Sequence, residues 1–211
     1  MKRVINLDNW NRKEHFKFFS ALDDPFWGIT TTVDFTSIYQ QSKNMEVSFF
    51  LYSVHFLLKC INATTAFKLR IENGEVVEYD KINISPTIGR EDGTFGFGFF
   101  EYDTDLSLFI VNAEKEIHRV KNSTGLSFSK DTARADVIRY SALPWFAFSE
   151  MKHAGSIQTG DSIPKISTGK LIQEKKKLLL PISISVHHGL VDGRNVAEFI
   201  QNVKDGQNNT L

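Results

Sequence analysis

An alternating apolar segment near the end of this 211-residue chain most constrains what it can fold into. In residues 181–186 the apolar side chains alternate with proline or serine, and strand neighbours point to opposite faces, so one face is apolar. The segment runs into His187-His188-Gly189-Leu190-Val191-Asp192-Gly193, and residues 196–203 carry apolar residues at helical spacing. The pattern predicts a buried strand, a glycine-bounded turn and a helix.

The two histidines of this turn are candidates for proton transfer. Neutral imidazole is the side chain best suited to accept a proton near pH 7, and the end of a strand holds it on a rigid scaffold. A structural histidine is the alternative interpretation. A shared metal ion is not expected, because His187 and His188 point to opposite faces. The chain has one cysteine, Cys60, and its other histidines show no ligand spacing: His15, His55, His118 and His153.

Composition excludes several classes of protein. The net charge is zero and the sequence pI is about 7.0, so neither nucleic acid nor an acidic membrane surface is expected as a partner. A lone cysteine suits a reducing compartment. The first residues lack a signal-peptide core, and no apolar run reaches membrane-spanning length. We therefore expect a cytoplasmic protein with one domain over residues 1–211.

Helix and strand patterns alternate along the chain and predict an α/β fold, a mixed sheet with helices on its faces. The predicted helices cover residues 12–20, 46–63 and 103–120, with a cap at Asp103, Thr104 or Asp105, and a strand covers residues 27–35. Residues 67–79 alternate around Asn73-Gly74, which predicts a β-hairpin.

The most unusual composition is Phe95-Gly96-Phe97-Gly98-Phe99-Phe100-Glu101-Tyr102. Alternation puts Phe95, Phe97 and Phe99 on one face and the glycines on the other. One interpretation is a core strand whose glycines allow a close backbone approach. The other is the aromatic wall of a ligand pocket. Both stay open on sequence alone.

Five segments together resemble the chloramphenicol acetyltransferase family. They are Trp10-Asn11-Arg12-Lys13-Glu14-His15-Phe16-Lys17-Phe18-Phe19, Ser141-Ala142-Leu143-Pro144-Trp145, Pro164-Lys165-Ile166-Ser167-Thr168-Gly169-Lys170, Leu178-Leu179-Leu180-Pro181 and the His187–Gly193 heptapeptide. Residues 40–135 match only in their pattern of elements. The heptapeptide also resembles the one that closes dihydrolipoyl acyltransferase domains. The resemblance implies the family's α+β sandwich.

The resemblance implies acetyl transfer from acetyl-coenzyme A to a hydroxyl. His188 matches the general base and Ser141 the hydroxyl that stabilises the tetrahedral oxyanion. Asp192 matches a structural aspartate that pairs with an arginine matching Arg12. Without the family, Ser141 would be a turn or cap residue and Arg12 a solvated helix residue. No Gly-x-Ser-x-Gly surrounds Ser141, so we expect direct transfer without an acyl-serine.

Binding residues and assembly are also carried over from the family. Phe18 and Phe19 match aromatic positions at the acceptor end of a tunnel, and Trp145 and Lys170 match positions near the coenzyme. Ser167 replaces a threonine whose hydroxyl could hold a water. The family implies a homotrimer in which the neighbouring chain contributes the base to each active site.

Departures from the family concern the acceptor and the coenzyme. Met151 and His153 stand where the acceptor pocket has Phe and Leu, and Leu171 replaces a Tyr near the coenzyme. Arg194 replaces an aromatic residue. We expect an O-acetyltransferase acting on chloramphenicol or a similar amphipathic acceptor. The alternatives are a family member acting on another acceptor, such as a lipoamide thiol, and a binding homologue without turnover.

Overall fold

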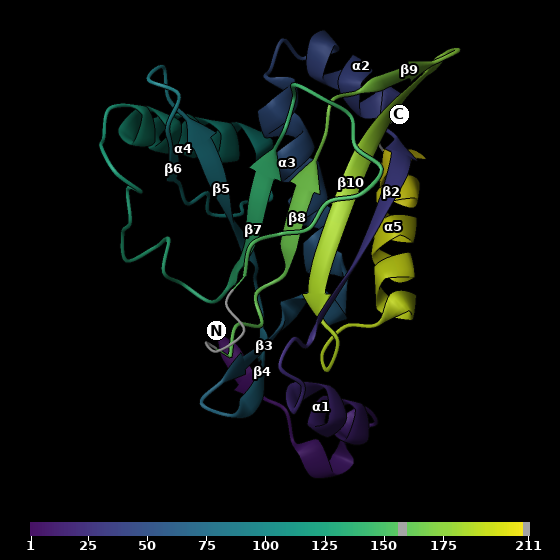
Figure 1. Ribbon diagram of the computed structural model, residues 1–211. Helices are drawn as coiled ribbons and strands as arrows, with labels where there is room; N and C mark the ends of the chain where they lie inside the picture. The colour runs from purple at the N-terminus through teal and green to yellow at the C-terminus, as the bar shows by residue number, and fades with distance from the viewer. Residues whose placement is uncertain (156–159, 209–211) are drawn as a thin grey trace.

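The computed structural model describes residues 1–155 and 160–208 and contains a mixed sheet (Figure 1). The strands, in spatial order, are β2 (Phe26–Asp34), β10 (Lys177–His187), β8 (Lys165–Thr168), β7 (Val137–Ala142), β5 (Asn83–Gly89) and β6 (Phe95–Phe97), with β9 (Ile172–Glu174) on the start of β10. Strand β7 is parallel to β5 and β8, and the other pairs are antiparallel. The predicted mixed sheet is confirmed.

Helices and a long connection cover opposite faces of this sheet. The helices are α1 (Lys13–Ser20), α2 (Thr36–Asn44), α3 (Phe49–Ala63), α4 (Leu106–Lys121) and α5 (Gly193–Asn208), with short 3-10 helices η1 (Leu7–Asn9) and η2 (Thr65–Lys68). Helices α3 and α5 lie on one face, and the connection from β7 to β8 crosses the other, which we call the outer face (Figure 1). None of the helices in the described ranges is both long and apolar enough to span a bilayer.

A second, smaller sheet lies near α1. It consists of β1 (Lys2–Val4), β4 (Glu75–Tyr79) and β3 (Leu69–Glu72), all antiparallel. The predicted hairpin forms its β3–β4 pair, and Asn73 and Gly74 at the tip both have positive φ, which asparagine and glycine tolerate best.

Strand β10 is an interior strand of the sheet and has a partner on each edge. It pairs with β2 from Leu179↔Asp34 to His187↔Phe26 and with β8 on its other edge. Ile182, Ile184 and Val186 are fully buried, as the alternation predicts. The intervening serines and His187 are therefore on the outer face.

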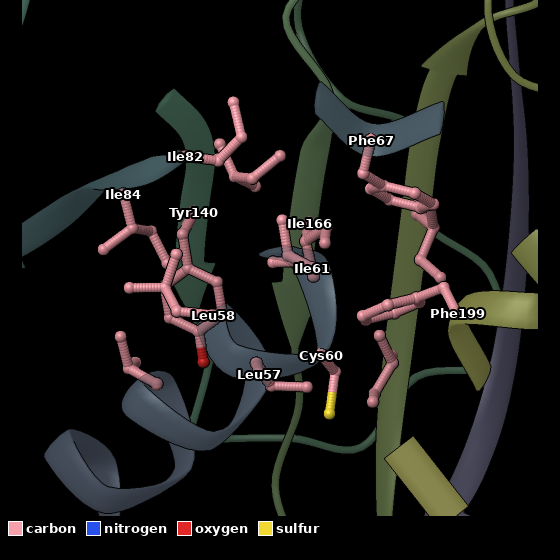
Figure 2. Packing of buried hydrophobic residues seen from close by; sticks show 14 of the residues in the cluster. Leu57, Leu58, Cys60, Ile61, Phe67, Ile82, Ile84, Tyr140, Ile166 and Phe199 are labelled. Carbon is pink, nitrogen blue, oxygen red and sulfur yellow. The ribbon is translucent and has the colours of Figure 1, made fainter. Parts of the chain in front are cut away.

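The apolar core lies between the sheet and α3 and α5. Ile61 of α3 lies against Ile166 of β8 and Leu58 of α3 lies beside Tyr140 of β7, as Figure 2 shows. Leu57 of α3 and Phe199 of α5 belong to the same core. Full burial of such a side chain contributes about 1.5–3 kcal/mol. The apolar residues almost all round α3 are explained by this sandwiched position.

Two helix predictions need correction. Helix α3 begins at Phe49, after Ser48, and not at Glu46, which has positive φ (55°). Helix α2 is absent from the predicted elements, because among its residues only Ile38 and Ser42 are buried and its apolar periodicity is weak. For α4 the cap is Asp105, whose carboxylate accepts hydrogen bonds from the backbone N–H groups of Ser107 and Leu108.

The Phe95–Tyr102 segment is part strand and part loop. Only Phe95–Phe97 forms a strand, and Phe100 makes an isolated bridge to Ile84. Phe100 lies in the apolar core, so the core interpretation of this segment holds at Phe100. The close approach at Gly96 comes from the side chains of Arg90 and Ser127, not from a backbone, since a Cβ there would lie 2.5 and 2.6 Å from them.

Arg70 of β3 is an unpredicted fully buried cation that joins the two sheets. Its Nε donates to the carbonyl of Ala135 (2.7 Å) and its Nη2 to that of Val137 (2.6 Å), at the start of β7. Its Nη1 donates to the carbonyls of Phe67 and Leu69. Burial lowers the pKa of the guanidinium to about 10, so it stays charged near neutrality.

We predict that Arg70→Met lowers the free energy of unfolding by at least about 3 kcal/mol, because several buried carbonyls lose their donor at once. Urea unfolding followed by circular dichroism measures the change. Lys115→Met, which removes an exposed cation of α4, is the matched control and should change little. Equal stability of the two variants would contradict this role for Arg70.

Candidate active site

The outer face of the sheet carries a row of hydroxyl groups. Strand register places Ser141 of β7 beside Ser167 of β8, then Ser183 of β10 and Thr30 of β2. We call these four residues the hydroxyl row. The Oγ1 of Thr87 donates a hydrogen bond to Ser141 Oγ (3.1 Å). Ser141 Oγ therefore already accepts one bond, and its own proton is left for another partner.

A cavity of about 430 Å³ lies beside this row and is called the serine cavity here. Ser141 and Ser167 line it on the sheet side. Phe97 and Phe128 also line it, and their rings stack with centroids 5.5 Å apart. The pocket-wall interpretation of the phenylalanine-rich segment thus holds for Phe97. The cavity combines polar and aromatic walls, as an amphipathic ligand requires.

The predicted acceptor residues Met151 and His153 lie at the same cavity. They belong to the connection that crosses the outer face, and both line the serine cavity. The Nε2 of His153 lies 2.9 Å from Ser167 Oγ, so the two share a hydrogen bond. Burial, with a smaller effect from the charge of Lys165, lowers the pKa of His153 and favours the neutral imidazole.

A second cavity of about 520 Å³ lies over β2 and the end of β10. His187, Phe26 and Trp27 are among its lining residues, and it shares Met151, His153 and Lys165 with the serine cavity. The connection between β7 and β8 therefore separates two hollows on one face of the sheet.

His187 has a structural role. Its side chain is buried, its Nδ1 accepts a hydrogen bond from the backbone N–H of Gly189 (3.2 Å), and its ring meets the edge of Phe26. Burial lowers its pKa to about 4. A Cβ on Gly189 would lie 3.1–3.3 Å from His187 and from the backbone of Phe16, which explains the glycine. The first histidine thus fixes the turn that carries the second.

The imidazole of His188 is held between aromatic rings. It stacks on Phe19 at a centroid distance of 3.9 Å and lies 5.4 Å from the ring of Trp27. Phe18 meets Phe19 edge-on and is largely exposed. Helix α1 therefore places Phe19 against His188, with Phe18 beside Phe19.

The backbone of His188 is fixed as well as its ring, because its N–H lies 2.8 Å from the carbonyl oxygen of Pro25. Since Nδ1 of His188 is buried and has no hydrogen-bond partner within residues 1–155 and 160–208, Nε2 is the ring nitrogen that can exchange a proton with a ligand. No sequence pattern predicts Pro25 or Trp27 next to His188. Pro25 precedes β2 and Trp27 is its second residue, and β2 meets β10 only through long-range pairing.

Arg12 and Asp192 form an ion pair between the start of α1 and the turn after β10. The second Nη atom of Arg12 donates to the carbonyl of His188 (3.2 Å), and Asp192 Oδ1 accepts from the backbone N–H groups of Arg194 and Asn195. Burial opposes ionisation of Asp192, but its hydrogen bonds with Arg12 and the backbone outweigh burial and hold its pKa below the ordinary value. The side chain of Arg12 is only 16% exposed, so the solvated-helix interpretation is wrong.

His188 and Ser141 lie far apart within one chain. His188 is five residues along from Ser183, and Ser141 is two strands away from Ser183. At ~3.3 Å per residue and ~4.8 Å between strands, their Cα atoms are roughly 20 Å apart. His188 is also absent from the walls of the serine cavity. One chain therefore does not bring the predicted base to the predicted oxyanion donor.

The residues predicted to bind the coenzyme follow the C-terminal ends of β7 and β8. Trp145 is 73% exposed, and the backbone N–H of Lys170 donates to the carbonyl of Phe146 (3.0 Å), which joins the two segments. The Lys170 side chain is exposed. Leu171 differs, because it packs against the apolar core and offers no exposed ring.

Further features of the site escape prediction from the sequence. Thr87 follows an ordinary strand pattern, and its contact with Ser141 depends on strand pairing. Asp161 and Lys165 form an ion pair on the outer face, although Lys165 begins β8, a strand whose residues are all buried. No local pattern predicts such contacts, because each joins separate segments. Within residues 1–155 and 160–208, no group of three or more His, Cys, Asp or Glu side chains could hold a metal ion.

We predict that Arg12→Ala lowers the free energy of unfolding by roughly 1–3 kcal/mol, because Asp192 and the carbonyl of His188 lose a charged donor. In the wild type this contribution is present above the ordinary aspartate pKa of 3.8 and is lost as the pH falls below it. Urea unfolding at pH 7 and pH 3 measures both effects. Lys13→Ala, which breaks the exposed pair with Asp8, is the control and should change little. An Arg12→Ala variant as stable as this control at pH 7 would contradict the structural role.

Comparisons with known proteins agree with this geometry. The chain matches the family model described as chloramphenicol acetyltransferase over residues 2–204. It is 28% identical to chloramphenicol acetyltransferase 3 of Escherichia coli over 98% of this chain and 97% of that protein. It is also 28% identical to the chloramphenicol acetyltransferase of Clostridioides difficile, over 95% of this chain and 93% of the relative.

Solved structures give the same result for the fold. A chloramphenicol acetyltransferase structure superposes with a TM-score of 0.90 at 29% identity, covering 98% of this chain and 100% of that one. A probable dihydrolipoamide acetyltransferase of Listeria monocytogenes has a TM-score of 0.69 at 13% identity, over 98% of this chain and 94% of its own, and shows a shared fold alone. The chain belongs to the chloramphenicol acetyltransferase family and is an acetyl-coenzyme A-dependent acetyltransferase.

Proposed function

We propose that this protein transfers the acetyl group of acetyl-coenzyme A to a hydroxyl of chloramphenicol or a similar amphipathic acceptor. The observation that carries the proposal is the serine cavity, where Ser141 of the hydroxyl row faces the stacked rings of Phe97 and Phe128. Its volume of about 430 Å³ is within the usual range for a small-molecule site. Residues 1–211 act as one acyltransferase domain in this proposal.

His188 is the general base of the proposed reaction. An alcohol is a weak nucleophile at pH 7, so His188 Nε2 takes its proton as the alcohol oxygen attacks the thioester carbon. The tetrahedral intermediate then collapses, the carbon–sulfur bond breaks, and the leaving thiolate takes the proton back from the imidazolium. The products are the acetyl ester and free coenzyme A. Stacking on Phe19 and the bond from its backbone N–H to Pro25 keep the ring in place.

Ser141 stabilises the oxyanion of the tetrahedral intermediate. Because Ser141 Oγ accepts its bond from Thr87, its own O–H can donate to a negatively charged oxygen. Such a donor typically contributes about 10²–10³-fold to turnover. Ser167, the next residue of the hydroxyl row, could order a water beside the same oxygen and is itself held by His153.

The assembly that we propose is a homotrimer with active sites at the boundaries between chains. The supporting observation is the distance of roughly 20 Å between the His188 and Ser141 backbones in one chain, which general-base catalysis cannot bridge. In a closed ring each chain can place its His188 at the serine cavity of a neighbour. Phe18 and Phe19 come from the same chain as that histidine and would complete the acceptor pocket of the neighbouring chain.

The coenzyme would approach from the end of the site opposite the acceptor. The exposed ring of Trp145 suits stacking, and the exposed ammonium of Lys170 suits a phosphate group. Ser167, three residues before Lys170, lines the serine cavity near this end. Leu171 contributes apolar packing beneath the segment and no ring for stacking.

We predict that the purified protein releases thiol from acetyl-coenzyme A only when chloramphenicol is added. His188→Ala should lower this release by about 10²–10⁴-fold, because the base is removed while the fold is kept. A thiol-reactive chromophore follows the release. His118→Ala is the matched control, since His118 lies on the exposed part of α4.

The result that would contradict this function is thiol release that is the same with and without an acceptor, or the same in His188→Ala. Release that responds to another alcohol but not to chloramphenicol would keep the reaction and change the acceptor.

A further inference from the structure

Lys165 is a buried cation in the wall of the serine cavity. It lies on the outer face of β8, between Arg139 of β7 and Ser185 of β10, and its side chain is only 8% exposed. Its Nζ lies 3.4 Å from Asp161 Oδ2 and 4.3 Å from the centroid of the Phe26 ring. Charged hydrogen bonds are usually near 2.7–2.9 Å, so this ion pair is loose for an ammonium with three donors.

The charges around the serine cavity do not balance. The Asp161 carboxylate that pairs with Lys165 also accepts a hydrogen bond from Arg139 (2.8 Å), so two cations share one carboxylate. Arg139, Lys152 and Lys165 all line the cavity, and no acidic residue of the described ranges does. The cavity therefore has a positive potential.

His153 adds a polar group on the same side. Its Nε2 is paired with Ser167, while its Nδ1 is buried and has no hydrogen-bond partner among the residues that the structure describes. A buried nitrogen without a partner loses its bonds to water and gains none in return, which is unfavourable. That loss disappears when a ligand or a water supplies the missing bond.

From these groups we propose that the serine cavity selects an alcohol that carries an anionic group, with Lys165 and His153 as the residues that recognise the anion. The inference rests on the function proposed above and names its preferred class of acceptor. Neutral acceptors such as chloramphenicol use the same hydroxyl row but place no anion beside Lys165.

Strand geometry sets the size of this acceptor. Lys165 is two residues before Ser167 on the same face, and Ser141 is beside Ser167. The Cα atoms of Lys165 and Ser141 are then roughly 8 Å apart. A benzene ring with a hydroxymethyl group and a carboxylate on opposite sides is of about this length.

The test compares two probes that differ only in charge, 4-(hydroxymethyl)benzoate and its methyl ester. Binding of each to the purified full chain in its native assembly is measured by isothermal titration calorimetry. The variants are Lys165→Met and the double variant Lys165→Met/Asp161→Asn, which removes the cation without leaving a buried carboxylate. Lys115→Met on α4 is the matched control, and thermal unfolding reports whether each variant is folded.

We expect the wild type to bind the carboxylate about 10- to 100-fold more tightly than the ester, as expected for one charged hydrogen bond. This preference should disappear in the double variant and persist in Lys115→Met. An ester that binds as tightly as the carboxylate, no measurable binding of the carboxylate, or a preference that survives in the double variant would overturn the inference. Chloramphenicol-dependent thiol release, assayed on the same wild-type sample, separates failure of this inference from failure of the proposed function.

Discussion

The pairing of β10 with β2 and β8 is the constraint on which the rest of the structure depends. It fixes a face of Ile182, Ile184 and Val186 against α3 and α5 and a polar face on the other side. A shift of one residue would exchange the two faces and turn the serines toward the apolar core. The same register places Ser183 beside Ser167, whose other neighbour is Ser141. Strand β10 then ends at the turn that carries His188.

Different forces hold the two ends of the site. At the end of β10, Arg12, Asp192 and the buried His187 fix the turn by an ion pair and hydrogen bonds across long sequence separations. At the serine cavity, strand register and the bond from Thr87 fix Ser141. Neither end can move toward the other without breaking strand pairs of β10. This separation supports the proposal that a second chain completes the site.

Local patterns predict much of this fold, whereas contacts between distant segments escape them. The alternation in β10, the hairpin at Asn73-Gly74 and the apolar surface of α3 follow from side-chain periodicity, but the buried Arg70 looks like any surface cation of a hairpin. The motifs locate His188 and Ser141, yet their separation in one chain depends on strand order. Lys165 and Asp161 meet at the outer face only because β8 lies between β7 and β10.

In the proposed assembly, the base and the oxyanion donor of one active site come from different chains. Complementation between two inactive variants, His188→Ala and Ser141→Ala, tests it most directly after the two are unfolded together and reassembled. If each site combines two chains, random mixing at equal amounts should restore about one quarter of the wild-type rate of acetyl transfer, since one combination in four is intact. Activity that stays at the level of the separate variants, although mixed assemblies form, would contradict the account.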